Sequence, residues 1–233
     1  MTREAYIKKL FAAYSLVSVL SEKNGCKVLR LRNRDSGKDM VLRSFPLHLD
    51  AYEILCGIRC ENLPEIYDAI DLDDGQIVLE EYIDGITVAQ VMEGGNYRYL
   101  GAKKVLTGVC HGLSVLHERG LVHRDVKPEN VIIGSDGRAV LIDFNASRMV
   151  SNACKDTVIM GTVGYASPEQ LGISQSDART DIYAVGVLLN VMLTGRHPTE
   201  AFARGRAGRV VKKCTSLNPD DRYRSAEILK NAL

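Results

Sequence analysis

The sequence lacks both a long apolar run and an excess of charge. No stretch of about 18 consecutive apolar residues occurs, although a membrane-spanning helix needs that length. The 30 Lys and Arg residues nearly balance the 29 Asp and Glu residues, which gives a formal net charge of +1. A balanced charge provides no general attraction to nucleic acid or to a membrane surface. We therefore expect no nucleic acid and no membrane among the partners of the chain.

A cysteine-rich metal motif and a secretion signal are also missing. Six cysteines are scattered along the chain, and Cys56 with Cys60 has no second pair at zinc-site spacing, so reduced thiols are expected. Residues Met1 to Tyr14 have the pattern of a short amphipathic helix with Lys8 and Lys9 inside it, unlike a signal peptide. Internal repeats and low-complexity tracts are absent. These features predict a cytoplasmic protein.

The most informative segment is His123-Arg124-Asp125-Val126-Lys127-Pro128-Glu129-Asn130, which contains a carboxylate, cations and an amide in one short loop. The apolar residues before it predict a helix and a short strand, and Val131 to Ile133 predict a strand after it. Asp143-Phe144-Asn145 lies further on and follows the strand-like run Ala139 to Ile142. A second carboxylate can then face the first.

These residue types suit phosphoryl transfer, in which the protein mainly aligns a hydroxyl with a phosphate and neutralises charge on its oxygens. Asp125 is suited to orient the hydroxyl and accept its proton, and Lys127 to neutralise the transferring phosphate. Asn130 and Asp143 offer the oxygen ligands that Mg²⁺ prefers. We therefore predict Asp125, Lys127 and Asn130 as catalytic residues, with Asn130 and Asp143 as metal ligands.

A third motif follows in the order found in protein kinases, Gly161-Thr162-Val163-Gly164-Tyr165-Ala166-Ser167-Pro168-Glu169. With it, nearly the whole chain resembles the eukaryotic-like serine/threonine protein kinases. Asp181 to Gly186 resembles the helix that anchors the catalytic loop, and Arg222 resembles the arginine that pairs with Glu169. The stretch from Tyr165 to Gly195 is similar to small kinases of Gram-positive bacteria.

This resemblance implies an α+β, two-lobed protein-kinase-like fold, with a small, mainly antiparallel β N-lobe and a mainly helical C-lobe. It implies a single kinase domain over residues 1–233, with the N-lobe at 1–83 and the C-lobe at 84–233. A chain of 233 residues with 45% hydrophobic content can fill two cores, although it is short for this fold.

The upstream third departs from the family pattern at the phosphate-covering loop. The glycine positions of that loop fall on Ser21, Lys23 and Cys26, and Gly25 is the nearest glycine. Without glycines, backbone amides approach phosphates less closely. Lys23 is then either a charge that replaces this contact or a solvated turn residue.

Arg43 stands where the family has a lysine that contacts the nucleotide phosphates and pairs with a helix glutamate, which would be Glu53. Arginine keeps the charge, but its planar fork prefers a bidentate carboxylate. In this interpretation Arg43 holds Glu53 and misses the phosphates. The lost contact would cost about 3 kcal/mol of transition-state stabilisation and slow the reaction roughly a hundredfold. The sequence does not distinguish a natural arginine from an inactivating replacement.

Two further segments resemble family features. Glu80 to Gly85 follows a predicted buried strand and resembles the hinge that accepts adenine, so backbone groups of Glu81 and Ile83, with Val28, are expected to bind the nucleotide. Glu80 either lies at the back of that pocket, where a carboxylate needs a partner, or points to solvent. Asn145 replaces a family glycine and tolerates left-handed backbone angles.

The segment from Asp143 to Glu169 bears on the substrate. Thr162 lies where kinases acting on serine and threonine have a threonine, which favours a serine or threonine hydroxyl of a protein as the acceptor. Arg124 either binds a phosphate on this segment or only braces the loop. Self-phosphorylation is expected on Ser151, Thr157 or Thr162.

The resulting hypothesis is a serine/threonine protein kinase that uses ATP and Mg²⁺ and is slowed by Arg43. The main alternative is a pseudokinase that serves as a nucleotide-binding or scaffold module. Arg43 and the missing glycines favour this alternative, and the intact catalytic loop opposes it. Kinases of small molecules share the Asp and Asn ligands but generally lack the segment from Thr162 to Glu169.

Overall fold

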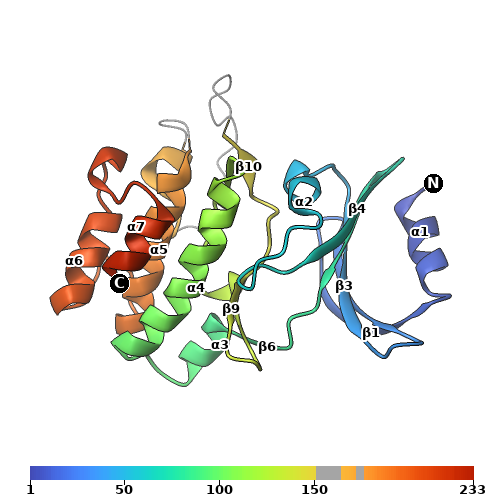
Figure 1. Ribbon diagram of the computed structural model, residues 1–233, viewed down its shortest axis with the longest axis horizontal. Helices are drawn as coiled ribbons and strands as arrows, with labels where there is room; N and C mark the ends of the chain where they lie inside the picture. The colour runs from blue at the N-terminus through green and yellow to red at the C-terminus, as the bar shows by residue number, and fades with distance from the viewer. Residues whose placement is uncertain (151–163, 172–175) are drawn as a thin grey trace. The chain divides into compact units, whose positions relative to one another are not determined.

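The computed structural model describes residues 1–150, 164–171 and 176–233. The chain forms two compact units, an N-terminal unit of Met1–Cys60 and Pro64–Ile83 and a C-terminal unit of Glu61–Leu63 and Asp84–Leu233. An antiparallel sheet dominates the first unit and helices dominate the second (Figure 1). The predicted α+β class, with an antiparallel N-terminal part and a helical C-terminal part, is confirmed.

The N-terminal unit is built on one five-stranded antiparallel sheet in the order β1-β2-β3-β5-β4. Apolar residues two positions apart share one face of a strand, and six of them form a buried cluster on this sheet, which α1 covers with Tyr6, Ile7 and Leu10. The cluster contains Leu29, Leu31, Met40, Leu42, Ile77 and Leu79. The elements are α1 (Arg3–Leu10), β1 (Tyr14–Lys23), β2 (Cys26–Asn33), β3 (Asp39–Phe45), α2 (Asp50–Leu55), β4 (Ile66–Leu72) and β5 (Gly75–Glu81).

The predicted N-terminal helix is present but shorter than expected. It begins after Thr2, whose Oγ1 accepts a hydrogen bond from the N–H of Ala5 at 3.3 Å, and it ends at Leu10. Its apolar side packs on the sheet, which agrees with the amphipathic pattern.

The loop that was expected to cover phosphates is a tight hairpin between β1 and β2. Lys23 pairs directly with Cys26, and the two residues between them, Asn24 and Gly25, have φ values of 51° and 75°. Asn-Gly with positive φ at both positions is the preferred two-residue hairpin turn. The sequence interpretation named Gly25 but missed this turn.

Helices form most of the C-terminal unit, and α4, α5, α6 and α7 lie together in Figure 1. A Cβ atom at Gly186 of α5 would lie 2.3 Å from Cβ of Cys214 in α6, so glycine permits the close approach of these two helices. The elements are β6 (Gly85–Thr87), α3 (Val88–Glu93), α4 (Tyr99–His117), β7 (Leu121–Val122), η1 (Pro128–Asn130), β8 (Val131–Gly134), β9 (Ala139–Leu141), β10 (Arg148–Met149), η2 (Pro168–Leu171), α5 (Ala178–Thr194), α6 (Gly205–Cys214), η3 (Pro219–Asp221) and α7 (Ala226–Ala232).

Two smaller sheets accompany these helices, β6-β8-β9 and β10-β7. The predicted strands around the catalytic loop are confirmed as β7, β8 and β9. Within the described parts of the chain, we find no helix with the length and apolar character that crossing a membrane requires.

Candidate active site

The fully buried carboxylate of Asp181, on α5, holds the start of the loop that follows β7. Its Oδ2 accepts a hydrogen bond from the N–H of His123 at 2.9 Å, and its Oδ1 accepts one from the N–H of Arg124 at 2.8 Å. Nε2 of His117 lies 2.8 Å from Oδ2. Burial alone raises the pKa of Asp181, but the hydrogen bond from His117 and the other partners outweigh it, and the pKa is lowered. An ionised carboxylate therefore fixes the backbone of the loop.

The three predicted catalytic side chains meet within this loop. Nδ2 of Asn130 donates hydrogen bonds to the backbone oxygen and to Oδ2 of Asp125, both at 2.9 Å. Nζ of Lys127 lies 2.7 Å from the same Oδ2. The side chains of Asp125 and Lys127 are 16% and 20% exposed, so both reach solvent from a largely enclosed position. An ammonium and an amide thus orient one carboxylate, as a positioned proton acceptor requires.

Two residues of the site other than glycine have left-handed backbone conformations. Arg124 has φ of 69° and Asp143 has φ of 70°, and such residues typically cost about 1–3 kcal/mol. Arg124 is fixed on both sides, because Asp181 accepts from its N–H and Nε2 of Gln170 donates to its carbonyl oxygen at 2.8 Å. Asn145, noted in the sequence for its tolerance of left-handed angles, does not adopt one, whereas Asp143, two residues earlier, does.

The pairing of β8 with β9 brings the two predicted metal ligands to the same end of a strand pair. Val131 pairs with Leu141, and the N–H of Ile142 donates to the carbonyl oxygen of Asn130 at 2.9 Å. Asp143 is the next residue. Since Nδ2 of Asn130 is used in the bonds to Asp125, its amide oxygen is the atom suited to bind a cation. An amide oxygen and a carboxylate are donors that fit Mg²⁺.

His123 connects the catalytic loop to the segment that carries Asp143. Its ring is fully buried, Nε2 lies 3.2 Å from the carbonyl oxygen of Ile142, and its edge meets the ring of Phe144 at a centroid distance of 5.7 Å. Burial lowers the pKa of His123 and outweighs the nearby carboxylates, which act in the opposite direction. A neutral imidazole therefore donates to Ile142 and ties the two segments together.

The predicted pair between Glu169 and Arg222 is confirmed. Nη1 and Nη2 of Arg222 lie 2.6 and 3.0 Å from the two carboxylate oxygens of Glu169, and both residues are buried. Burial raises the pKa of Glu169, but the hydrogen bonds from Arg222 and the other groups outweigh it, and the pKa is lowered. This pair anchors the end of the motif at Ser167, Pro168 and Glu169. The predicted phosphorylation sites Ser151, Thr157 and Thr162 lie outside the described residues.

In the N-terminal unit, Arg43 forms a buried ion pair with Glu80. Its Nε lies 2.6 Å from Oε1 of Glu80, and the two side chains are 7% and 3% exposed. Glu80 on β5 pairs with Val41 on β3, so Arg43 is its diagonal neighbour on the same face of the sheet. The buried carboxylate of Glu80 therefore binds the guanidinium of Arg43, and the alternative in which Glu80 points to solvent is excluded.

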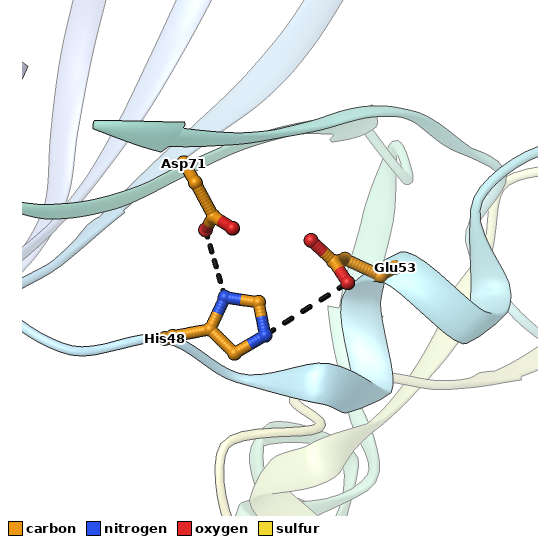
Figure 2. Close-up of side chains that lie close together, drawn as sticks. All are labelled: His48, Glu53 and Asp71. Carbon is orange, nitrogen blue, oxygen red and sulfur yellow. Dashed lines mark hydrogen bonds and ion pairs between the residues drawn. The ribbon is translucent and has the colours of Figure 1, made fainter.

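The expected pairing of Arg43 with Glu53 is consequently wrong. Within the described residues these two side chains form no ion pair, and Oε2 of Glu53 instead lies 3.8 Å from Nε2 of His48. Figure 2 shows Glu53 and Asp71 facing His48 from α2 and β4. The side chain of Glu53 is about half exposed, so it lies at the surface beside His48.

The remaining nucleotide candidates also belong to the N-terminal unit. Val28 on β2 pairs directly with Arg43 on β3, and Val28 is partly buried. The N–H of Glu81 donates to the carbonyl oxygen of Glu65 at 2.9 Å, and Ile83 is 6% exposed. The structure thus brings Val28 and Arg43 together and engages the N–H of Glu81 within the unit. Sequence reasoning missed His117 and Gln170, which support the catalytic loop from outside any motif.

The residues around Asp125 lie within a segment that matches a known family. The protein kinase domain model matches residues 21–220. The chain belongs to the protein kinase family. The eukaryotic-like serine/threonine kinase resemblance is confirmed, since the similar proteins include bacterial serine/threonine-protein kinases.

Three relatives show how far the likeness of this kinase family member extends. Serine/threonine-protein kinase D of Synechocystis sp. is 28% identical over 225 residues, covering 86% of this chain and 44% of that protein. Serine/threonine-protein kinase PknL of Mycobacterium tuberculosis is 37% identical over 169 residues, covering 71% of this chain and 42% of that protein. Probable serine/threonine-protein kinase PknB of Lactococcus lactis is 29% identical over 167 residues, covering 68% and 27%. This kinase family member therefore matches less than half the length of each of these relatives.

Proposed function

We propose that the chain is an ATP-dependent serine/threonine protein kinase with a single domain over residues 1–233, its N-lobe at 1–83 and its C-lobe at 84–233. The observation that carries the proposal is the Asp125 carboxylate, which Lys127 contacts at 2.7 Å and Asn130 at 2.9 Å. The relatives named as serine/threonine kinases support a serine or threonine hydroxyl of a protein as the acceptor.

Asp125 orients the acceptor hydroxyl and removes its proton as the oxygen attacks the γ-phosphorus of ATP. The bond from that phosphorus to the β–γ bridging oxygen breaks, and ADP leaves. A positioned base of this kind contributes about 10²- to 10⁴-fold to a rate. Lys127 contacts the carboxylate of Asp125, and its role is to neutralise charge on the phosphoryl oxygens. Asn130 keeps the carboxylate oriented through its Nδ2.

Asn130 and Asp143 are the residues that would hold Mg²⁺, as their oxygen donors and their positions beside β8 and β9 support. When bound, this ion neutralises charge on the phosphates of the nucleotide. On the nucleotide side we assign Val28, Arg43 and backbone groups of Glu81 and Ile83. Glu53 is not assigned, because Arg43 pairs with Glu80.

The proposal includes self-phosphorylation on Ser151, Thr157 or Thr162. Arg124 then binds the phosphate group of the modified residue. A phosphate carries three strong acceptor oxygens, which a guanidinium matches well. Arg124 is 5% exposed, and Asp181 and Gln170 hold its backbone, so the residue that carries this charge has a fixed place in the catalytic loop. A cytoplasmic location belongs to the same proposal.

A pseudokinase is the second candidate, and the buried pair of Arg43 and Glu80 favours it. A guanidinium that is 7% exposed and bonded to a carboxylate is poorly placed to follow a phosphate. In that case the chain binds a nucleotide or a partner without turnover.

The test is phosphate transfer from labelled ATP in the presence of Mg²⁺, with the chain alone and with a generic basic protein. Arg43→Lys and Asp125→Asn are measured beside the unchanged chain. Transfer that disappears in Asp125→Asn supports the kinase, even where it is slow. Transfer by Arg43→Lys alone identifies the arginine as the cause of inactivity. Absence of transfer in every variant, with nucleotide binding retained, overturns the kinase proposal in favour of the pseudokinase.

A further inference from the structure

One histidine of the N-terminal unit lies among three carboxylates at the beginning of α2. Nε2 of His48 is 2.9 Å from Oδ1 of Asp50. Figure 2 shows the other two contacts, in which Nε2 lies 3.8 Å from Oε2 of Glu53 and Nδ1 lies 2.7 Å from Oδ1 of Asp71. His48, Asp50 and Glu53 belong to one short segment, whereas Asp71 reaches the histidine from β4. The catalytic proposal uses none of these groups.

We propose that His48, Asp50 and Glu53 bind a divalent transition metal ion, Zn²⁺, and that Asp71 orients the histidine. Imidazole nitrogen and carboxylate oxygen are both common zinc ligands. Ligand atoms of His48, Glu53 and Asp71 lie within 4.8 Å of one another, and Asp50 joins this group at 2.9 Å from Nε2 of His48.

The two donor separations from His48 lie close to those around a tetrahedral ion. Metal–ligand bonds of about 2.0–2.1 Å separate neighbouring donors by roughly 3.3 Å in tetrahedral geometry. The separations from Nε2 of His48 are 2.9 Å to Asp50 and 3.8 Å to Glu53, one on each side of that value. Side-chain rotations alone can equalise them, because all three side chains are at least 41% exposed. Three protein ligands leave a fourth position for water.

The other side of the imidazole is supported in the manner of a zinc-bound histidine. Such a histidine usually donates its second N–H to a carboxylate, which fixes the tautomer and the ring orientation. Asp71 occupies this position at 2.7 Å from Nδ1. Gln76, which is fully buried, donates to Oδ1 of Asp71 at 3.3 Å and accepts from the N–H of Leu49 at 3.3 Å. The buried amide therefore ties the orienting carboxylate to the chain just after His48.

Charge favours a cation at this position. Among the described residues, no Lys or Arg side chain forms an ion pair with Asp50, Glu53 or Asp71, and their ion-pair partner is His48. Three carboxylates around one imidazole leave a local excess of negative charge even when the imidazole is protonated. A divalent ion removes this excess, and the nitrogen donor selects Zn²⁺ over Mg²⁺.

Metal binding at this site would fix α2, because two of the ligands lie in its first turn and Asp71 connects them to β4. Glu53 would then be held beside His48, away from Arg43. The site itself does not depend on the proposed kinase activity, so it can be tested without turnover.

The experiment is a titration of the whole chain with Co²⁺, as a spectroscopic substitute, and with Zn²⁺, in excess Mg²⁺. We expect one equivalent to bind with a visible spectrum of nitrogen and oxygen ligation. His48→Asn should weaken binding by at least about a hundredfold, and Asp71→Asn by about 10- to 100-fold, the usual effect of losing an orienting group. Asp50→Asn and Glu53→Gln should each weaken it at least about tenfold.

Matched variants test whether side chains outside this site bind the metal ion. Asp68→Asn removes an exposed carboxylate from the same strand as Asp71 and should leave affinity unchanged. Cys56→Ser with Cys60→Ser should also leave it unchanged, which excludes thiolate ligation, and Asp143→Asn should do the same for the catalytic loop. Each variant is checked for its unfolding temperature without metal. Absence of stoichiometric binding in excess Mg²⁺, or binding that survives His48→Asn in a folded protein, overturns the proposal.

Discussion

The catalytic loop of the C-terminal unit and the β3–β5 strand pair of the N-terminal unit both bury charged side chains, with different results. Asp181 is buried to hold backbone N–H groups, and the loop that it holds presents Asp125 and Lys127 with part of each side chain exposed. Arg43 and Glu80 are buried against each other. In the first region the buried carboxylate therefore positions reactive groups. In the second region the buried carboxylate of Glu80 binds Arg43, the cation that the family pattern assigns to the nucleotide.

The largest expected effect is on stability in the strand pair. Glu80→Leu or Arg43→Met alone removes one partner of a buried ion pair and should lower the free energy of unfolding by about 3–5 kcal/mol. The double variant replaces the pair by apolar side chains and should lie within about 1 kcal/mol of the unchanged chain. Urea unfolding of the four proteins measures the coupling. Additive losses in the double variant would show that the pair does not act as a unit.

The second prediction contrasts a lysine of the catalytic loop with a lysine of the N-terminal unit. Lys127→Ala should lower the rate of phosphate transfer by about 10²- to 10³-fold, because it removes a cation positioned by Asp125. Lys23→Ala removes an exposed cation beside the β1–β2 turn and should change the rate less than about twofold if Lys23 is a solvated turn residue. Initial rates at saturating ATP decide between them. A large loss in Lys23→Ala would instead mean that this lysine replaces the missing glycine contacts.

The third prediction concerns pH and the buried His123 of the loop. Its pKa in the folded chain is lowered from its ordinary value of 6.5, so folding favours the neutral ring. The unfolded chain binds the additional proton below that value, and stability is therefore fully present above pH 6.5 and is lost as the pH falls towards the folded pKa. The slope approaches about 1.4 kcal/mol per pH unit for a single group.

Urea unfolding between pH 7.5 and pH 5, without nucleotide or metal, measures this slope. His123→Phe keeps a buried ring but cannot titrate, so the free energy of unfolding of this variant should lack the part of the pH slope that comes from His123. At pH 7.5 the variant should be less stable than the unchanged chain, because it loses the hydrogen bond to Ile142. Equal slopes in the two proteins would show that His123 does not distinguish the folded from the unfolded chain.

The same two regions show what could be predicted from sequence. The loop from His123 to Asn130 could be read because its chemistry is contiguous and because apolar runs mark the strands on each side. The partner of Arg43 could not be predicted from the sequence, since Glu53 and Glu80 are both carboxylates in the same unit. The choice between them depends on the β3–β5 register, which places Glu80 diagonally opposite Arg43, and sequence spacing does not reveal that register.

Support from distant residues was equally hidden. His117 and Gln170 contact the catalytic loop through Asp181 and the carbonyl oxygen of Arg124, and neither lies in a motif that predicts such a contact. The Asn24-Gly25 turn, by contrast, carried a readable hairpin signal. A comparison with the family's glycine-rich loop does not reveal this turn, because that pattern concerns the glycine positions and not the strands on each side.

The smallest expected effect lies at this turn. Gly25 has φ of 75°, and a Cβ atom there would meet only Pro46, at 3.7 Å and beyond, so Gly25→Ala should cost about 1 kcal/mol through backbone conformation alone. Gly94→Ala, at φ of −81°, is the matched control and should change stability by less than about 0.5 kcal/mol or increase it slightly. The apparent affinity for ATP measured beside stability decides what the hairpin does. If Gly25→Ala weakens ATP binding by more than its loss of stability accounts for, the turn approaches the phosphates as a glycine loop does. If only stability falls, the hairpin is a structural element, and both nucleotide-side departures, at this turn and at Arg43, reduce contact with the phosphates.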